Sequence, residues 1–330
     1  MTPISHNQRL AWVNSSQLCE AWRDATESWR GYRYGLRWKR VNGVDKLFRQ
    51  ADRLGNGRVI GPRDESSEQL LAEFQQGKLR ARARLESLRE KLAEQARMNV
   101  ALRLARAPTL VGRVCRVLDE AGLRKDFLVI GTQAMFAYEA AAGAFFLTEL
   151  LASGDIDLLF DARRKVTLVA RKVDRSGLLG LLRKADRSFT VPHKGFFRAV
   201  NDEGFMVDLV IPRRPMTESA AISFGEDDLV AAEVPGLQWL INSPHIAETV
   251  IDAKGMPFVM RVPDPRAFAL HKAWLSQQPE RNRIKQPRDL DQARAVAAAL
   301  REHMPQYPLD MNKLRALHGD VRRAVDLLVD

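Results

Sequence analysis

The sequence predicts an α/β (α+β) protein, in which a helical N-terminal region and a helical C-terminal cap flank a mixed β-sheet. In the middle of the chain, short apolar runs bounded by Gly, Asp or Pro alternate with helical periodicity, whereas both ends are mostly helical in pattern. The length of 330 residues favours more than one domain. We expect a basic, mostly helical region over 1–126, a sheet-containing domain over 127–262 and a helical region over 263–330.

The N-terminal region contains the strongest local turn signal of the chain. Two short alternating runs flank Asn42-Gly43, a dipeptide typical of a type I′ hairpin turn. Apolar residues at helical spacing predict the helices on either side, and Gly122 is expected to end the last of them. The predicted elements are a helix over 8–30, a hairpin over 32–49, a loop over 51–64, a helix over 64–97 and a helix over 108–122.

The remaining elements follow from alternation, apolar runs and capping residues. Asp264-Pro265 has the composition of a helix start, with Asp as the N-cap and Pro in the first turn. The predicted strands are 127–130, 155–160, a hairpin of 196–200 with 205–211, and short strands near 237–241 and 257–262 that complete the mixed sheet. The predicted helices are 133–142, 163–184 and three C-terminal ones that start near 264, 287 and 309.

Positive charge is concentrated in the first third of the chain. Residues 1–126 hold 25 Lys and Arg against 15 Asp and Glu, whereas the whole chain has a net charge of +11. This asymmetry favours a polyanionic partner or substrate, such as RNA, for the first third. An arginine-rich composition without a binding role would give the same counts, so both explanations stay open.

Aromatic and basic side chains mix along the predicted hairpin. The basic ones are Arg33, Arg37, Lys39 and Arg40, and the aromatic ones are Tyr32, Tyr34 and Trp38. The cations would neutralise phosphates and the rings could stack on unpaired bases, so we expect polyanion contacts here. Cross-strand packing of the rings is the alternative.

Composition excludes several other classes of protein. Cys19 and Cys115 cannot form a disulfide framework, and without a Cys-x-x-Cys pair there is no thiolate zinc site. The six histidines show no metal-ligand spacing, and we interpret His271 as structural or exposed. No apolar stretch of about 18 residues could cross a membrane, and the first residues do not form a signal peptide. We therefore expect a cytoplasmic protein without a membrane partner; the oligomeric state is not predicted.

Asp155 and Asp157 open the second predicted strand of the sheet. Side chains two apart on a strand project from the same face, so both carboxylates point together. They repel each other unless a cation lies between them, and hard oxygen ligands suit Mg²⁺ or Mn²⁺. Asp208 interrupts a later apolar strand, where a carboxylate is costly to bury without a partner. Three carboxylates would form a two-metal phosphoryl-transfer site, and strand capping is the alternative for the pair.

Gly131-Thr132 lies between the first strand of the sheet and a helix. A turn of small residues at a helix N-terminus presents backbone N–H groups to a phosphate, and the helix dipole favours the anion. The glycine turn, the aspartate pair and the distant third aspartate therefore form an ordered set.

This order resembles the DNA polymerase β-like nucleotidyltransferase superfamily, whose pattern is a Gly-Gly/Ser turn, Asp-x-Asp/Glu and a third acid on a later strand. The sequence is most similar to a bacterial family of nucleotidyltransferases within it, and the likeness extends back through the basic hairpin. The segments that carry it are Gly131-Thr132-Gln133-Ala134, Tyr138-Glu139-Ala140-Ala141-Ala142-Gly143 and the run from Gly154 to Arg163. Thr132 departs from the second small residue of the pattern but keeps a hydroxyl.

The resemblance implies the polymerase β-like fold and a role for each motif. Asp155 and Asp157 would ligate Mg²⁺ or Mn²⁺, and Asp208 would complete the triad and assist deprotonation of the acceptor. Gly131, Thr132 and Gln133 would contact the nucleotide.

Two C-terminal segments resemble the abortive-infection-type nucleotidyltransferases of type IV toxin–antitoxin systems. They are Phe268–Trp274 and Lys285–Asp291, in which Asp291 follows Asp289 by two residues where the family pattern has three. This likeness implies that Lys272 lies near the triphosphate and that Asp289 lies near the active site. A cation on a helix and an aspartate near a helix N-terminus, without a catalytic role, is the alternative.

The resemblance thus implies transfer of a nucleoside monophosphate from an NTP to a hydroxyl group, with release of pyrophosphate. The acceptor would be RNA such as tRNA, a protein or a small molecule, and a toxin-like role is an analogy at family level. The alternative is a nucleic-acid-binding protein that keeps the fold without turnover, against which the intact aspartate set argues.

Overall fold

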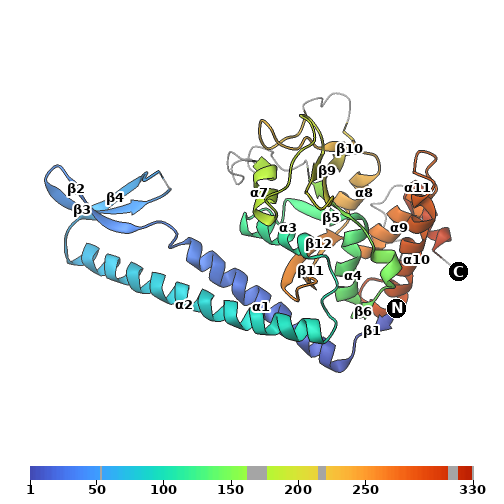
Figure 1. Cartoon of the computed structure of the whole chain (residues 1–330), viewed down its shortest axis with the longest axis horizontal. Coiled ribbons are helices and arrows are strands. Elements are labelled where there is room, and N and C mark those ends of the chain that lie inside the picture. The colour runs from blue at the N-terminus through green and yellow to red at the C-terminus, as the bar shows by residue number, and fades with distance from the viewer. Residues whose placement is uncertain (53, 162–176, 215–220, 311–318, 329–330) are drawn as a thin grey trace. The chain divides into compact units, whose positions relative to one another are not determined.

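The computed structural model describes residues 1–52, 54–161, 177–214, 221–310 and 319–328 (Figure 1). The chain forms two compact units, one of Met1–Ala11 with Asn99–Asp330 and one of Trp12–Met98. The division into three regions that the composition indicates stays a prediction. In the described part of the chain, no helix is long and apolar enough to cross a membrane.

The Trp12–Met98 unit joins two long helices to a small antiparallel sheet of order β2-β3-β4. Its elements are α1 (His6–Arg30), β2 (Leu36–Val41), β3 (Val44–Gln50), β4 (Gly57–Pro62) and α2 (Glu65–Ala101), of which the two helices extend beyond the unit. The predicted hairpin is confirmed, because Asn42 and Gly43 have φ values of 52° and 78°, the two positive angles of a type I′ turn.

Strand β4 corrects the loop predicted over 51–64. Glycines at both ends of the run weaken the strand signal. A Cβ atom at Gly57 would lie 2.0 Å from the carbonyl oxygen of Arg49, so glycine allows the two strands to pair there.

The other unit contains a mixed sheet, which confirms the predicted fold class. Its strands are β5 (Phe127–Ile130), β7 (Asp155–Phe160), β8 (Arg198–Val200), β9 (Met206–Pro212) and β10 (Ala232–Val234). Their order is β10-β9-β7-β5, and β8 pairs with the first half of β9. The pairs β7–β9 and β9–β10 are parallel, whereas β5–β7 and β8–β9 are antiparallel.

Helices and two small sheets surround this mixed sheet. They are β1 (Thr2–Pro3), α3 (Thr109–Glu120), the 3₁₀-helix η1 (Gly131–Ala134), α4 (Met135–Ala142), β6 (Ala144–Phe145), α5 (Thr148–Leu151), α7 (Gly177–Ala185), α8 (Leu237–Asn242), β11 (His245–Ile251), β12 (Pro257–Pro263), α9 (Pro265–Ser276), α10 (Lys285–His303), α11 (Gly319–Arg323) and η2 (Ala324–Leu327). The predicted N-cap of α9 is confirmed, since Asp264 accepts a hydrogen bond from the backbone N–H of Arg266.

Two strand predictions were wrong. The segment near 237–241 is helix α8, and its buried residues Leu237, Leu240 and Ile241 have helical spacing in a run too short for periodicity to decide. The strand near 257–262 exists, but it pairs with β11 in a separate two-stranded sheet. Most of the predicted helix over 163–184 and most of the expected third C-terminal helix lie outside the described residues, at 162–176 and 311–318.

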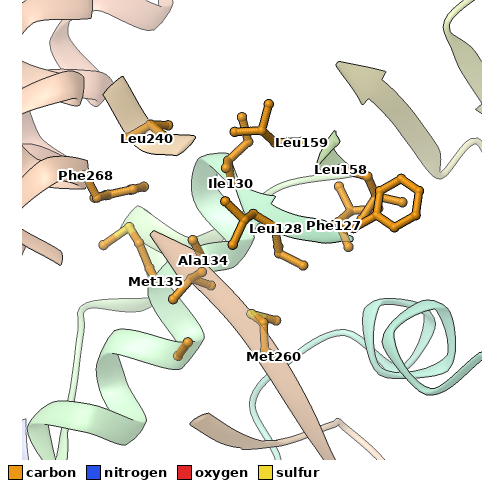
Figure 2. Close-up of a cluster of buried hydrophobic side chains, with 14 of the residues drawn as sticks. Phe127, Leu128, Ile130, Ala134, Met135, Leu158, Leu159, Leu240, Met260 and Phe268 are labelled. Atoms are coloured by element: carbon orange, nitrogen blue, oxygen red, sulfur yellow. The ribbon is translucent and has the colours of Figure 1, made fainter. Parts of the chain in front are cut away.

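The core lies where the sheet meets the helices that follow it. Figure 2 shows Ile130 of β5, Met135 of α4 and Phe268 of α9 in one apolar cluster, and all three side chains are buried. Leu240 of α8 belongs to the same cluster. Helix α9 is therefore packed next to the point where β5 ends and η1 begins.

Candidate active site

The strand register brings the three predicted aspartates together. Asp157 of β7 and Asp208 of β9 are direct partners in the parallel pair, and Asp155 lies two residues earlier on β7. On the other side of β7, Asp157 is the partner of Ile130, the residue before Gly131. The aspartates and the glycine turn thus lie at neighbouring positions of three adjacent strands.

Gly131 is required by both its backbone angle and its surroundings. Its φ is 66°, in the left-handed region that favours glycine. A Cβ atom there would lie 2.3 Å from Oδ2 of Asp157. The glycine therefore lets the start of η1 approach the carboxylate closely.

Gly131→Ala is expected to disturb the carboxylate as well as the backbone. Gly143 is the matched control, because its φ is 60° but the nearest atom to its added Cβ, Cδ1 of Ile4, would be 4.0 Å away. Each alanine should cost about 1–2 kcal/mol of stability through the left-handed backbone. Mn²⁺ titration should show weakened metal binding for Gly131→Ala alone. Equal metal binding by both variants would contradict the close approach.

Asp157 is the electrostatic centre of the group. Burial, followed by the charges of Asp155 and Asp208, raises its pKa to about 7. Lys272 and Lys285 oppose this shift of the pKa. Within the described part of the chain, Asp157 has neither a hydrogen bond nor an ion pair. Its carboxylate therefore lacks a local counter-charge in contact.

The other two aspartates accept hydrogen bonds from neighbouring side chains. Arg198 of β8, directly across from Asp208, donates from Nε and Nη2 to its two carboxylate oxygens at 2.7 Å each. Asp155 accepts a short hydrogen bond from the hydroxyl of Ser153. The bidentate geometry of the Arg198 pair makes it a strong interaction.

The donor set fits a divalent cation in its chemistry. Asp155 and Asp157 offer hard oxygen atoms, and the raised pKa of Asp157 shows a carboxylate that a cation would stabilise. Among the described residues, no three His, Cys, Asp or Glu side chains are arranged to hold a metal ion. Both carboxylate oxygens of Asp208 accept hydrogen bonds from Arg198. Asp155 and Asp157 would hold the first ion, and Asp208 would join only after Arg198 releases it.

A cleft of about 730 Å³ lies over these residues, a size suited to a nucleotide-sized ligand. The sheet contributes Asp155, Asp157 and Asp208 to one wall. Helices α9 and α10 contribute basic side chains to the other, namely Lys272, Lys285 and Arg288. Gly131 and Thr132 line the same cleft. The sheet side is thus acidic apart from Arg198, and the helical side is basic apart from Asp289.

Lys272 and Asp289, predicted only from a family resemblance, meet in this cleft. Nζ of Lys272 donates to Oδ1 of Asp289 at 2.6 Å, and Nε of Arg281 donates to Oδ2 at 2.6 Å. Burial lowers the pKa of Lys272, and the Asp289 carboxylate opposes that shift. Asp289 therefore holds two cations at the cleft wall, and its own pKa is lowered because both cations outweigh the effect of burial.

Thr132 and Gln133, the two predicted residues that follow Gly131, lie in different surroundings. Thr132 lines the cleft, and its hydroxyl accepts a hydrogen bond from Nε2 of Gln292 at 3.1 Å. Gln133 is buried, and its Nε2 donates to the backbone carbonyls of Ser153 and Asp155. Gln133 thus fixes the loop that carries the first aspartate.

The four predicted polyanion contacts belong to the Trp12–Met98 unit. Arg33, Arg37, Lys39 and Arg40 are all exposed. Lys39 lies over the ring of Phe48 at 4.8 Å, and Arg63 lies over the ring of Trp38 at 5.1 Å. Of the aromatic side chains named for the hairpin, Trp38 is therefore covered by a cation, while the phosphate contacts stay a prediction.

Several cleft residues escaped the sequence interpretation, although signals existed for some of them. The predicted hairpin around 201–204 pairs Arg198 with Asp208 by its register. Lys285, Arg288 and Gln292 recur at helical spacing with Asp289. His271, interpreted as structural or exposed, is buried and lines the cleft.

Comparison with known protein families gives one match, and it covers this site. A family model described as Nucleotidyltransferase matches residues 109–318, which include the glycine turn, the three aspartates and helices α9 and α10. No curated protein and no solved structure matches the chain. Because the matched segment exceeds half of the sequence and contains the whole cleft, the chain belongs to this nucleotidyltransferase family.

Proposed function

We propose that the cleft transfers a nucleoside monophosphate from an NTP to a hydroxyl acceptor and releases pyrophosphate, with Mg²⁺ or Mn²⁺ held by Asp155 and Asp157. The observation that carries this proposal is that one cleft is lined both by carboxylates and by cations. The aspartates belong to the sheet, and the cations belong to α9 and α10. A polyphosphate bridged to the acidic wall by a cation and to the basic wall directly would match both walls.

The basic wall would bind the non-transferred phosphates. Lys285 is exposed and has no ion pair within the described residues, so its charge is available to an anion. The Nε atom of Arg288 is buried without a hydrogen-bond partner, and its Nη2 donates to the carbonyl of Ala152. Together with the backbone N–H groups at Gly131 and Thr132, these side chains would orient the polyphosphate for in-line attack.

The acidic wall would act on the attacking hydroxyl group. The divalent ion would supply charge neutralisation at the phosphoryl oxygens, the usual contribution of a metal in phosphoryl transfer. Asp208 is placed next to Asp157 by the strand register and would accept the proton of the acceptor hydroxyl. It could do so only after its two oxygens are released by Arg198.

Arg198→Met is expected to strengthen Mn²⁺ binding in the absence of nucleotide by about tenfold, because it frees Asp208 for the ion and removes an opposing cation. Titration followed by electron paramagnetic resonance would count the bound ions directly. Arg213→Met is a suitable control, since Arg213 directly follows β9, the strand of Asp208, but does not line the cleft. Unchanged Mn²⁺ binding by Arg198→Met would show that the pair does not compete with the metal.

We propose RNA as the acceptor class, supported by the basic surface of the Trp12–Met98 unit. The test is incubation with an α-labelled NTP, Mg²⁺ and total RNA or total protein, with Asp157→Ala as the inactive control. Label in RNA from the wild type alone supports the proposal, and label in the protein fraction alone replaces RNA by a protein acceptor. Equal labelling by both variants rejects the enzyme activity.

The basic surface is tested separately with a charge-matched pair of variants. One replaces Arg33, Arg37, Lys39 and Arg40 by Ser, and the other replaces Arg80, Arg84, Arg89 and Lys91, which are also exposed, by Ser.

The toxin-like role is a further part of this proposal, and its support is that Lys272 and Asp289 meet at the cleft as the abortive-infection resemblance implies.

A further inference from the structure

One end of the cleft differs in chemistry from the end that holds the aspartates. Its wall is formed by β10, the loop after it and α8, through the apolar side chains Val234, Pro235, Leu237 and Leu240. In the sheet order β10-β9-β7-β5, β10 is two strands away from β7 and on the side opposite to β5. The cleft therefore runs from a charged end to an apolar end.

His271 of α9 provides a polar atom within the cleft wall. Its side chain is buried and lines the cleft, and its Nε2 atom has no hydrogen-bond partner within the described part of the chain. Burial and the neighbouring Lys272 lower its pKa to about 3, so the imidazole is neutral at physiological pH. Burying a polar atom without a hydrogen-bond partner costs free energy, so a ligand atom that forms a hydrogen bond with it would be bound selectively.

The surroundings of His271 hold the ring in place. The rings of Trp239 and Trp274 lie 6.3 and 5.8 Å from it, centre to centre. Gly236 has a φ of 83°, and a Cβ there would lie 2.8 Å from Trp274, so glycine allows the tryptophans to pack closely. The imidazole is therefore held by a packed aromatic group, as base recognition requires.

An NTP has the same division as the cleft, with a charged polyphosphate at one end and a flat ring with a hydrogen-bonding edge at the other. We propose that the NTP base occupies the apolar end and that Nε2 of His271 hydrogen-bonds to its edge, which makes His271 a specificity-determining residue. This inference rests on the proposed function, because it takes an NTP as the ligand of the cleft. Neutral imidazole presents either a donor or an acceptor at Nε2, so it favours only some bases.

The test is equilibrium binding of the four NTPs and of inorganic tripolyphosphate, which has no base, to the full chain with Mg²⁺. The variant is His271→Phe, and the control is His303→Phe, a histidine of α10 outside the cleft. In the wild type, we expect the preferred NTP to bind at least about tenfold more tightly than the weakest. His271→Phe should bring the four within about threefold and leave tripolyphosphate binding unchanged.

The tryptophans give a second measurement, which remains valid if His271→Phe does not fold. NTPs, but not tripolyphosphate, should change the fluorescence of wild-type protein, and Trp274→Phe should remove most of the change. Retained discrimination in a folded His271→Phe, equal binding of all four NTPs to the wild type, or a fluorescence change with tripolyphosphate would overturn the inference alone. Absence of binding by every NTP and by tripolyphosphate would reject the proposed function as well.

Discussion

Asp157→Asn is expected to abolish nucleotidyl transfer and at the same time to stabilise the metal-free protein. The loss of activity should be at least about a thousandfold, since an amide ligates divalent cations far more weakly than a carboxylate. The gain in stability follows from the raised pKa of Asp157, from 3.8 to about 7, because burial and two neighbouring carboxylates oppose its ionisation. Asn keeps the shape and removes the charge.

The pH dependence of this gain has a definite sign. A pKa raised in the folded state favours folding at low pH, and this contribution is lost as the pH rises from about 4 to about 7. Asp157→Asn should therefore match the wild type near pH 4 and exceed it by about 4 kcal/mol above pH 7. Urea unfolding in the presence of a chelator measures this difference in the free energy of unfolding. Asp202→Asn, in an exposed turn, is the control. A wild type as stable as Asp157→Asn at pH 8 would contradict the proposed repulsion.

Asp289→Ala is expected to destabilise the protein by about 3–5 kcal/mol, because it leaves Lys272 buried without its partner. The second cation, Arg281, is partly exposed and can turn to water, so the loss comes chiefly from Lys272. The double variant Lys272→Met/Asp289→Leu replaces both charges by apolar groups and should recover most of the lost stability.

Activity separates the structural role of this pair from its catalytic role. If Lys272 contacts the triphosphate, the double variant should be stable and yet poorly active, chiefly through a higher KM for the NTP. A double variant with wild-type KM and kcat would assign the pair to the core alone. A stability loss below about 1 kcal/mol for Asp289→Ala would contradict the burial of the pair.

The sequence predicted the elements that carry the site better than those around it. The strands at 127–130 and 155–160 were predicted to the residue, because a glycine turn and an aspartate pair mark their limits. Helix α8 was mistaken for a strand, because six residues are too few for a helical period to appear. Strand β4 was missed, because its Gly57 serves a close backbone approach that a sequence pattern does not show.

The same limit applies to the candidate site. The aspartates follow from side-chain alternation on strands, whereas the meeting of Lys272 with Asp289 depends on how α9 packs on α10. His271 has no sequence signal, since its significance comes from an unpaired atom in a cleft wall. Sequence patterns thus predict which residues share an element, and tertiary packing decides which of them meet.

The most direct test of the central claim is to give the wild-type protein, with Mg²⁺ and RNA, an NTP labelled at either the α- or the γ-phosphate. Nucleotidyl transfer at Asp155 and Asp157 predicts that the α-label becomes attached to the acceptor and that the γ-label leaves as pyrophosphate. Asp157→Asn should give neither product. Transfer of the γ-label to the acceptor, or release of γ-labelled orthophosphate without attachment of the α-label, would contradict the account.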